Sequence, residues 1–188
     1  MFLKRDNPYT LVIGMTSVKM GDRLLQVGCA HAGRLAAIAA KVGLSGRAVA
    51  VVPDESSAIR ARKGAADAGV LIDVHIAPIA RMPLDAGGFD LAVVDDTSGL
   101  VGTMSAEDRR QAMREIARVL RPGGRVVMIG ATRRTGVGAI FSRAPVAPPF
   151  VSSGDAVQAL EANGFRSARV IGAREGLAFA EAVKPRDV

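Results

Sequence analysis

The sequence predicts an α/β fold of the open, doubly wound kind, in which helices cover both faces of a mainly parallel sheet. Short apolar runs alternate with helical patterns along nearly the whole chain of 188 residues, which is the signature of repeated strand–helix units. Hydrophobic residues make up 49% and charged residues 23% of the chain, values ordinary for a globular protein. A chain of this length suits one hydrophobic core, so we expect one domain over residues 1–188.

Two strand–helix units are expected at the start of this domain. The first strand is predicted at Arg23–Val27 and the second at Arg47–Val52. Between them, four apolar residues with the spacing of one buried helix face predict a helix packed on the sheet: Leu35, Ile38, Ala39 and Val42. Asp54 can accept hydrogen bonds from free backbone amides, so it predicts the start of a helix that runs to about Ala68.

The middle of the chain adds three strands. We expect them at Leu71–Ile76, Phe89–Val94 and Arg125–Ile129. A helix begins after Ser105, whose pairing with an acid three residues later is typical of a capped helix, and it stops at Arg121-Pro-Gly-Gly. The fifth strand follows at once.

The last third of the chain contains a proposed lid and a hairpin. Residues 131–152 hold two glycines and three prolines, which predicts a mobile loop or lid. A helix is expected at about 154–163, and strands at 165–172 and 177–183 form an antiparallel hairpin. Residues 1–20 are expected to form an N-terminal cap segment.

Three stretches resemble the class I S-adenosylmethionine-dependent methyltransferases: Leu24–Gly33 (LLQVGCAHAG), Phe89–Asp96 (FDLAVVDD) and Arg118–Arg125 (RVLRPGGR). The third is the most specific, and Ala162–Phe165 before the hairpin strengthens the match, which covers roughly residues 20 to 184. The resemblance implies a Rossmann-like, mostly parallel, seven-stranded sheet with an antiparallel C-terminal hairpin. Within the class, the chain looks most like the small-molecule methyltransferases of ubiquinone and menaquinone biosynthesis.

The turn after the first strand is the main candidate ligand site. Glycines there let a ligand approach the backbone, and the amino terminus of the next helix offers unpaired amides and a positive dipole end. The resemblance implies that the methionine part of S-adenosylmethionine lies over this turn and that its ribose faces the carboxylates after the second strand. The implied cofactor-binding residues are Gly28, Cys29, Ala30, His31, Gly33, Asp54, Glu55, Ala77, Pro78, Ile79 and Asp95.

The cofactor motif departs from the family pattern and is degenerate in this sense. The family usually has an acid at the position of Gln26, glycines at those of Ala30 and Ala32, an acid at that of Pro53 and often an acid near Pro78. Each missing hydrogen bond costs on the order of 1 kcal/mol, so losing three would weaken binding roughly a hundredfold. Asp54, one residue after Pro53, is placed to compensate for the missing acid at position 53.

Several polar residues near the predicted strand ends have two interpretations. His31 either faces the ligand or is solvated, and Cys29 is a small buried filler whose place at a helix amino terminus would lower its pKa. Asp95 and Asp96 follow the fourth strand, at the edge where such sheets bind ligands. Either one of the two carboxylates binds the cofactor's ammonium or orients the substrate, or both cap the next loop. Asp90 is interpreted as structural.

Composition excludes several other classes of function. The net charge is +7, but the arginines are scattered and the chain has no Trp, one Tyr and six Phe, which argues against nucleic-acid binding. The densest basic cluster, Arg133-Arg134, is a candidate anion-facing lip. One cysteine and two histidines give no recognisable zinc spacing. No apolar run is long enough for a membrane span and no signal peptide is evident, so a cytoplasmic location is expected.

The leading hypothesis is methyl transfer from S-adenosylmethionine to a small-molecule acceptor. The sulfonium is already an activated donor, so no dedicated catalytic side chain is required. Two alternatives stay open. One is a non-catalytic relative that keeps the fold to bind a ligand or partner. The other is a dinucleotide-binding protein, because Gly28–Gly33 also reads as Gly-x-Ala-x-x-Gly with an acid after the second strand.

Overall fold

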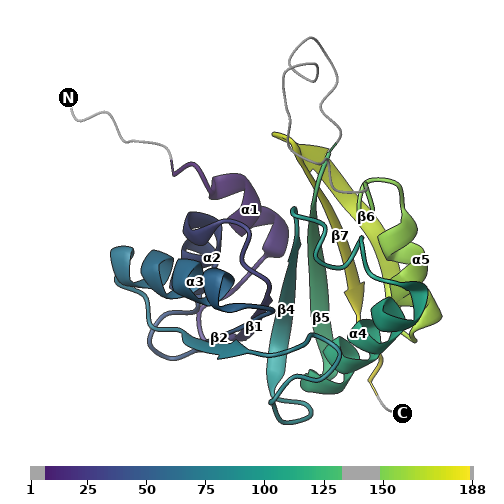
Figure 1. Cartoon of the computed structure of the whole chain (residues 1–188), viewed down its shortest axis with the longest axis horizontal. Coiled ribbons are helices and arrows are strands. Elements are labelled where there is room, and N and C mark those ends of the chain that lie inside the picture. Colours follow the sequence, from purple (N-terminus) through teal and green to yellow (C-terminus); the bar gives the residue numbers. More distant parts are fainter. Residues whose placement is uncertain (1–6, 133–148, 187–188) are drawn as a thin grey trace.

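A computed structural model describes residues 7–132 and 149–186 of the chain. Seven strands form one sheet: β1 (Arg23–Val27), β2 (Arg47–Val52), β3 (Asp73–Ile76), β4 (Phe89–Asp96), β5 (Leu120–Ala131), β6 (Arg166–Arg174) and β7 (Leu177–Val183). Their spatial order is β3-β2-β1-β4-β5-β7-β6 (Figure 1). The first five are parallel, and β7 runs antiparallel to both its neighbours. The predicted doubly wound, mostly parallel sheet with a closing hairpin is therefore confirmed.

Helices cover both faces of this sheet. They are α1 (Thr10–Thr16), α2 (Ala32–Ala39, continued by the 3-10 turn η1 at Ala40–Val42), α3 (Glu55–Asp67), α4 (Ala106–Val119) and α5 (Asp155–Ala162). The first three lie on one side of the sheet, and α4 and α5 lie on the other (Figure 1). No helix of the described ranges is long and apolar enough to cross a bilayer.

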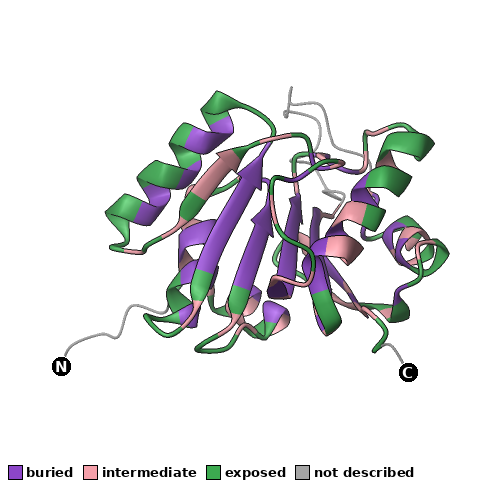
Figure 2. Ribbon diagram, turned by 90° about the horizontal axis from the view of Figure 1, so that it is seen from below, coloured by how far each residue is buried: buried purple, intermediate pink, exposed green. Residues whose placement is uncertain are grey.

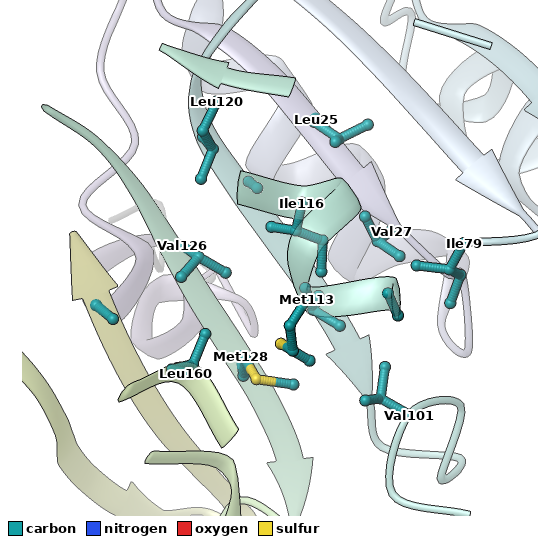
Figure 3. Packing of buried hydrophobic residues seen from close by; sticks show 14 of the residues in the cluster. Leu25, Val27, Ile79, Val101, Met113, Ile116, Leu120, Val126, Met128 and Leu160 are labelled. Carbon is teal, nitrogen blue, oxygen red and sulfur yellow. The ribbon is translucent and has the colours of Figure 1, made fainter. Parts of the chain in front are cut away.

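The central strands are buried on both faces, because the side chains that point to either face are mostly apolar (Figure 2). In β4, Leu91 and Val93 face the cluster under α1 and α2, and Ala92 and Val94 face the cluster under α4 and α5. The cluster under α4 and α5 is the larger of the two. Figure 3 shows Ile116 of α4 at its centre, with side chains of β5 and α5 around it.

Local signals in the sequence predict many of the helix and strand boundaries that the structure shows. β1 and β2 have the predicted bounds. Asp54 Oδ1 accepts a hydrogen bond from the Ser57 N–H at 2.8 Å, which starts α3 as expected. Ser105 Oγ likewise accepts from the Asp108 N–H at 3.1 Å. The hairpin turns through Glu175 and Gly176, which have φ of 55° and 79°.

Several boundaries differ from the prediction, and β6 (Arg166–Arg174) is shifted by one to two residues. β3 begins two residues later, and β4 continues through Asp96, so its two carboxylates belong to the strand. β5 begins at Leu120, where a turn was expected, because the strand is held from both sides. Phe89 pairs with Leu120, the Gly123 N–H donates to the Lys184 carbonyl oxygen, and the Lys184 N–H donates to the Gly124 carbonyl oxygen. Most of the expected lid, including Arg133-Arg134, lies outside the described residues.

Ile116→Ala should lower the free energy of unfolding by about 2–5 kcal/mol, because Ile116 is fully buried and the substitution leaves a cavity. Urea denaturation of the purified variant measures this loss. Ile59→Ala is the matched control, since Ile59 is 58% exposed on α3, and it should change stability by less than about 0.5 kcal/mol. Equal losses in the two variants would contradict the assigned core.

Candidate functional site

The candidate site lies where β1 and β4 end, at the point where the strand order changes direction. β1 and β4 are neighbours although α2, η1, β2, α3 and β3 separate them in the chain. Ligands of open α/β sheets bind at such a switch point, beyond the carboxyl ends of the strands. Residues 28–31, here called the β1 loop, lead from β1 into α2 at this edge.

Both glycines of the expected cofactor turn are crowded by side chains of this protein. Gly28 has a φ of 79°, and a Cβ there would collide with the Leu100 side chain and lie 3.2 Å from the Asp95 carbonyl oxygen. A Cβ on Gly33 would collide with the Tyr9 hydroxyl. The two glycines therefore make room for Leu100 and Tyr9 in this conformation.

Asp95 joins the β1 loop, α2 and the segment after β4. Its side chain is 1% exposed. Its Oδ2 accepts from the Ala30 N–H at 3.1 Å, and its Oδ1 accepts from the Thr97 hydroxyl at 2.6 Å. Arg34 Nη2 donates to both carboxylate oxygens at 3.0 Å and to Thr97 Oγ1 at 2.7 Å. The result is a buried ion pair in which both carboxylate oxygens accept hydrogen bonds.

Sequence reasoning missed Arg34. The residue lies in the first turn of α2, four residues before Ile38, so both belong to the helix face that packs on the sheet. A charged residue on that face is the signal that was available. Arg34 is 9% exposed, as expected of a charge that is buried together with a partner.

Asp96 faces the opposite side of the sheet from Asp95. Its Oδ1 accepts backbone hydrogen bonds from Val101 at 2.6 Å and Gly102 at 3.0 Å. Its Oδ2 is buried and has no hydrogen-bond partner among the described residues. Burial raises the pKa of this carboxyl group above its ordinary value. Asp96 thus caps the loop that follows β4.

His31 caps α2. Its Nδ1 accepts from the Arg34 N–H at 3.3 Å, and its ring lies edge-on to Tyr9 with the ring centres 5.7 Å apart. The imidazole is exposed. The structure therefore places His31, the last residue of the β1 loop, against Tyr9, which precedes α1.

Cys29 corrects an expectation from the sequence. The amino terminus of a helix was expected to lower the pKa of its thiol. Burial, helped by the nearby Asp95 carboxylate, instead raises it to about 11. Cys29 is 3% exposed, so it packs as a small apolar residue.

The carboxylates after β2 lie on the surface. Asp54 caps α3, and hydrogen bonds from the Ser56 hydroxyl and the Ser57 N–H lower its pKa. Glu55 is exposed and pairs with Arg62 at 3.4 Å. The helix that these residues begin contacts the β1 loop, since Arg60 of α3 donates to the Cys29 carbonyl oxygen at 2.6 Å.

The residues expected around the adenine follow β3. The Ala77 N–H donates to the Val52 carbonyl oxygen at 3.0 Å, and Pro78 is exposed. Ile79 points into the core cluster that contains Val27 (Figure 3). Asp90 lies at the start of β4, remote from this edge, and binds Arg23 and Arg121.

Two other features lie apart from this site. A cavity of about 350 Å³ opens near the amino ends of β2 and β3, at the opposite end of these strands from the candidate site, and its lining contains no residue of the β1 loop, Asp54, Glu55, Asp95 or Asp96. Within residues 7–132 and 149–186, no group of His, Cys, Asp and Glu is arranged to hold a metal ion.

Comparisons with known proteins identify a family for the segment that contains the β1 loop and β4. Residues 25–128 match a family described as a methyltransferase domain. An uncharacterized 37.1 kDa protein of a Streptomyces fradiae transposon is 29% identical over 119 residues, which are 63% of this chain. The chain spans about a third of that protein, 33% of its length.

Solved structures share the fold. A SAM dependent methyltransferase from Aquifex aeolicus has a TM-score of 0.76 and 19% identity, over 94% of this chain and 89% of that one. The (4+2)-cyclase SpnF has a TM-score of 0.68 and 18% identity, over 99% of this chain and 86% of that one. At such identities the likeness establishes the fold alone.

Alkylation of Cys29 should be much slower in the folded protein than in guanidinium at about pH 8, because its raised pKa keeps the folded thiol protonated. Iodoacetamide labelling followed by mass spectrometry measures both rates. The folded rate should rise toward pH 11. Equal rates in the folded and unfolded chain would contradict a buried thiol.

Asp96→Asn should make the protein more stable than the wild type at neutral pH. The raised pKa of Asp96 means that wild-type stability is lost as pH rises through that pKa, whereas asparagine does not titrate. Asparagine Oδ1 can accept the same two backbone hydrogen bonds. Thermal unfolding at several pH values should show a gap that grows with pH, and a constant gap would contradict this account.

Proposed function

Because this chain belongs to the methyltransferase domain family, we propose that it transfers a methyl group from S-adenosylmethionine to a small-molecule acceptor. The observation that carries the proposal is the extent of the family match, residues 25–128. That segment contains the β1 loop, the end of β2 and the end of β4, which are the parts of the sheet that form the candidate site.

Different residues of the site would bind different parts of the cofactor. The sulfonium supplies the activated methyl group, and the protein has to orient it and exclude water. The β1 loop would face the methionine part. Asp54 would hold the ribose, because both of its hydrogen bonds go to Oδ1 and leave Oδ2 to accept from ribose hydroxyls. This supports the sequence-based idea that Asp54 compensates for Pro53.

The fit is incomplete at two points. Leu100 crowds Gly28 and Tyr9 crowds Gly33, so a ligand reaches the glycine backbone only after these side chains turn away. Both side chains are half-buried and belong to segments at the edge of the site. We infer that residues 7–20, the described part of the expected cap segment, cover a single methyltransferase-like domain, since Tyr9 already contacts His31 of the β1 loop. Residues 1–6 lie outside the described residues.

We propose a small acceptor of the kind that ubiquinone and menaquinone methyltransferases use. The stretches Phe89–Asp96 and Arg118–Arg125 support this. The first stretch is β4, and the second contains the end of α4 and the start of β5.

The crowded glycines favour one alternative, a relative that binds a ligand or partner without transferring a methyl group. The fold likeness to SpnF, whose name describes a cyclase, is compatible with it. Dinucleotide binding is the remaining alternative. Calorimetric titration with S-adenosylhomocysteine and, in parallel, with NAD separates binding of the methyl-transfer cofactor from dinucleotide binding, and methyl transfer to added small-molecule acceptors separates an enzyme from a non-catalytic relative. Binding of S-adenosylhomocysteine alone supports the proposal, binding of NAD alone supports the dinucleotide function, and binding of neither overturns both.

Gly28→Ala should weaken S-adenosylhomocysteine binding by at least roughly tenfold, because the new methyl group pushes on Leu100 and on the Asp95 backbone beside the cofactor. Gly176→Ala is the matched control. Gly176 has the same φ of 79°, but a Cβ there meets nothing within 4 Å. Calorimetry on both folded variants tests the assignment, and wild-type affinity in Gly28→Ala would remove the β1 loop from the site.

A further inference from the structure

Exposed apolar side chains gather around the cavity near the amino ends of β2 and β3. The floor of this cavity is buried and apolar, and it includes Ala39, Val42 and Ala48. Leu44 and Leu71 also line the cavity, but their side chains are 97% and 83% exposed, so they form its rim. A contiguous exposed apolar patch of this kind is typical of an interaction surface.

Met20 extends the same surface. It is 80% exposed, and its Cγ would lie 3.5 Å from a Cβ on Gly43, another residue of the cavity lining. Single exposed apolar residues are normal, but these three come from segments far apart in the sequence and border one cavity. The cavity together with Met20, Leu44 and Leu71 is here called the apolar patch.

The charges at the apolar patch balance each other. Among the described residues, Arg47 and Asp73 are the charged ones that line the cavity, and Arg47 Nη2 lies 3.0 Å from Asp73 Oδ2. Both side chains are more than half exposed. The chain as a whole has a net charge of +7, which keeps copies of it apart, whereas this lining has no net charge. Two copies can therefore approach each other here without repulsion.

The ion pair also has groups left for a second partner. Both of its hydrogen bonds, from Arg47 Nε and Nη2, go to Asp73 Oδ2. Within the described part of the chain, Arg47 Nη1 and Asp73 Oδ1 form no hydrogen bond. One free donor and one free acceptor thus stand side by side at the cavity.

The apolar patch is complementary to itself. It combines a hollow with two leucines that project into solvent directly beside it. In a two-fold dimer the same surface meets itself, so any contact between two different residues occurs twice. Leu44 and Leu71 of each copy can then enter the cavity of the other copy, and Arg47 Nη1 of each can donate to Asp73 Oδ1 of the other. β3 is the edge strand of the sheet, so this side is open to a second copy.

We propose that the apolar patch is a homodimer interface, with a second copy of this chain as its occupant. The cavity is lined by 14 residues, fewer than the roughly 20–30 residues that each side of a standard interface contributes. The dimer is therefore weak, with a dissociation constant between about 1 μM and 1 mM. The interface lies at the opposite end of β2 and β3 from the candidate site, so dimer formation leaves that site open.

Sedimentation velocity on the purified full chain, between about 1 μM and 1 mM, tests the proposal. The dimer fraction of the wild type should rise with concentration. Leu44→Ser should weaken self-association at least roughly tenfold, because a buried leucine is lost from the interface. Ile59→Ser is the matched control, since Ile59 is 58% exposed but does not line the cavity, and it should associate like the wild type.

Two results of this experiment would overturn the proposal. A wild type that stays monomeric up to about 1 mM would exclude a second copy and leave the apolar patch to a different partner. A Leu44→Ser variant that associates like the wild type would place the dimer interface elsewhere. Neither result depends on unfolding, because both substituted side chains are exposed.

A charge exchange tests the two-fold arrangement itself. Arg47→Asp and Asp73→Arg each give the patch two like charges, so each variant alone should associate at least roughly tenfold more weakly than the wild type. In an equal mixture, each copy offers the other the opposite charge at both positions, and heterodimers should form with about wild-type affinity. A mixture that associates no better than the single variants would contradict the reciprocal ion pairs.

This inference is independent of the proposed function, and calorimetry keeps the two apart. Leu44→Ser should bind S-adenosylhomocysteine with the affinity of the wild type, because Leu44 lies at the opposite end of the strands from the candidate site. A coupled loss of dimer and ligand affinity in this variant would contradict an interface that leaves the site open. A wild type that dimerises but does not bind S-adenosylhomocysteine would overturn the proposed function alone.

Discussion

The buried Asp95 carboxylate is the interaction on which the geometry of the candidate site depends. It receives a backbone N–H of the β1 loop, the guanidinium of Arg34 and the hydroxyl of Thr97. A carboxylate buried without such donors would be strongly destabilising. The course of the loop, the start of α2 and the turn after β4 are therefore coupled, and none of them can change alone.

The sequence predicts the fold well where the deciding information is local. Asp54 and Ser105 are cap residues by their own chemistry, and the structure shows them capping α3 and α4. The early start of β5 could not be read from Arg121-Pro-Gly-Gly, because it depends on pairing with Phe89 in β4 and with Lys184 after β7. Those partners are distant in the chain, and tertiary pairing overrides the local turn signal.

The sequence predicts where the candidate site lies better than it predicts its contacts. The β1 loop and the end of β4 come together as expected from parallel strand order. The crowding by Leu100 and Tyr9, the buried Arg34 and the raised pKa of Cys29 arise from packing. A pattern of residue types shows which positions face an edge, but it does not show which side chain of the same protein already fills the space there.

The two described ends of the chain lie at opposite edges of the sheet. Tyr9 reaches Gly33 beside the β1 loop, whereas Arg186 lies next to Gly123 at the amino ends of the parallel strands. A surface-attached protein is therefore best tethered through its carboxyl-terminal side. Immobilisation through residues before α1 would place the support against the edge where a ligand has to enter.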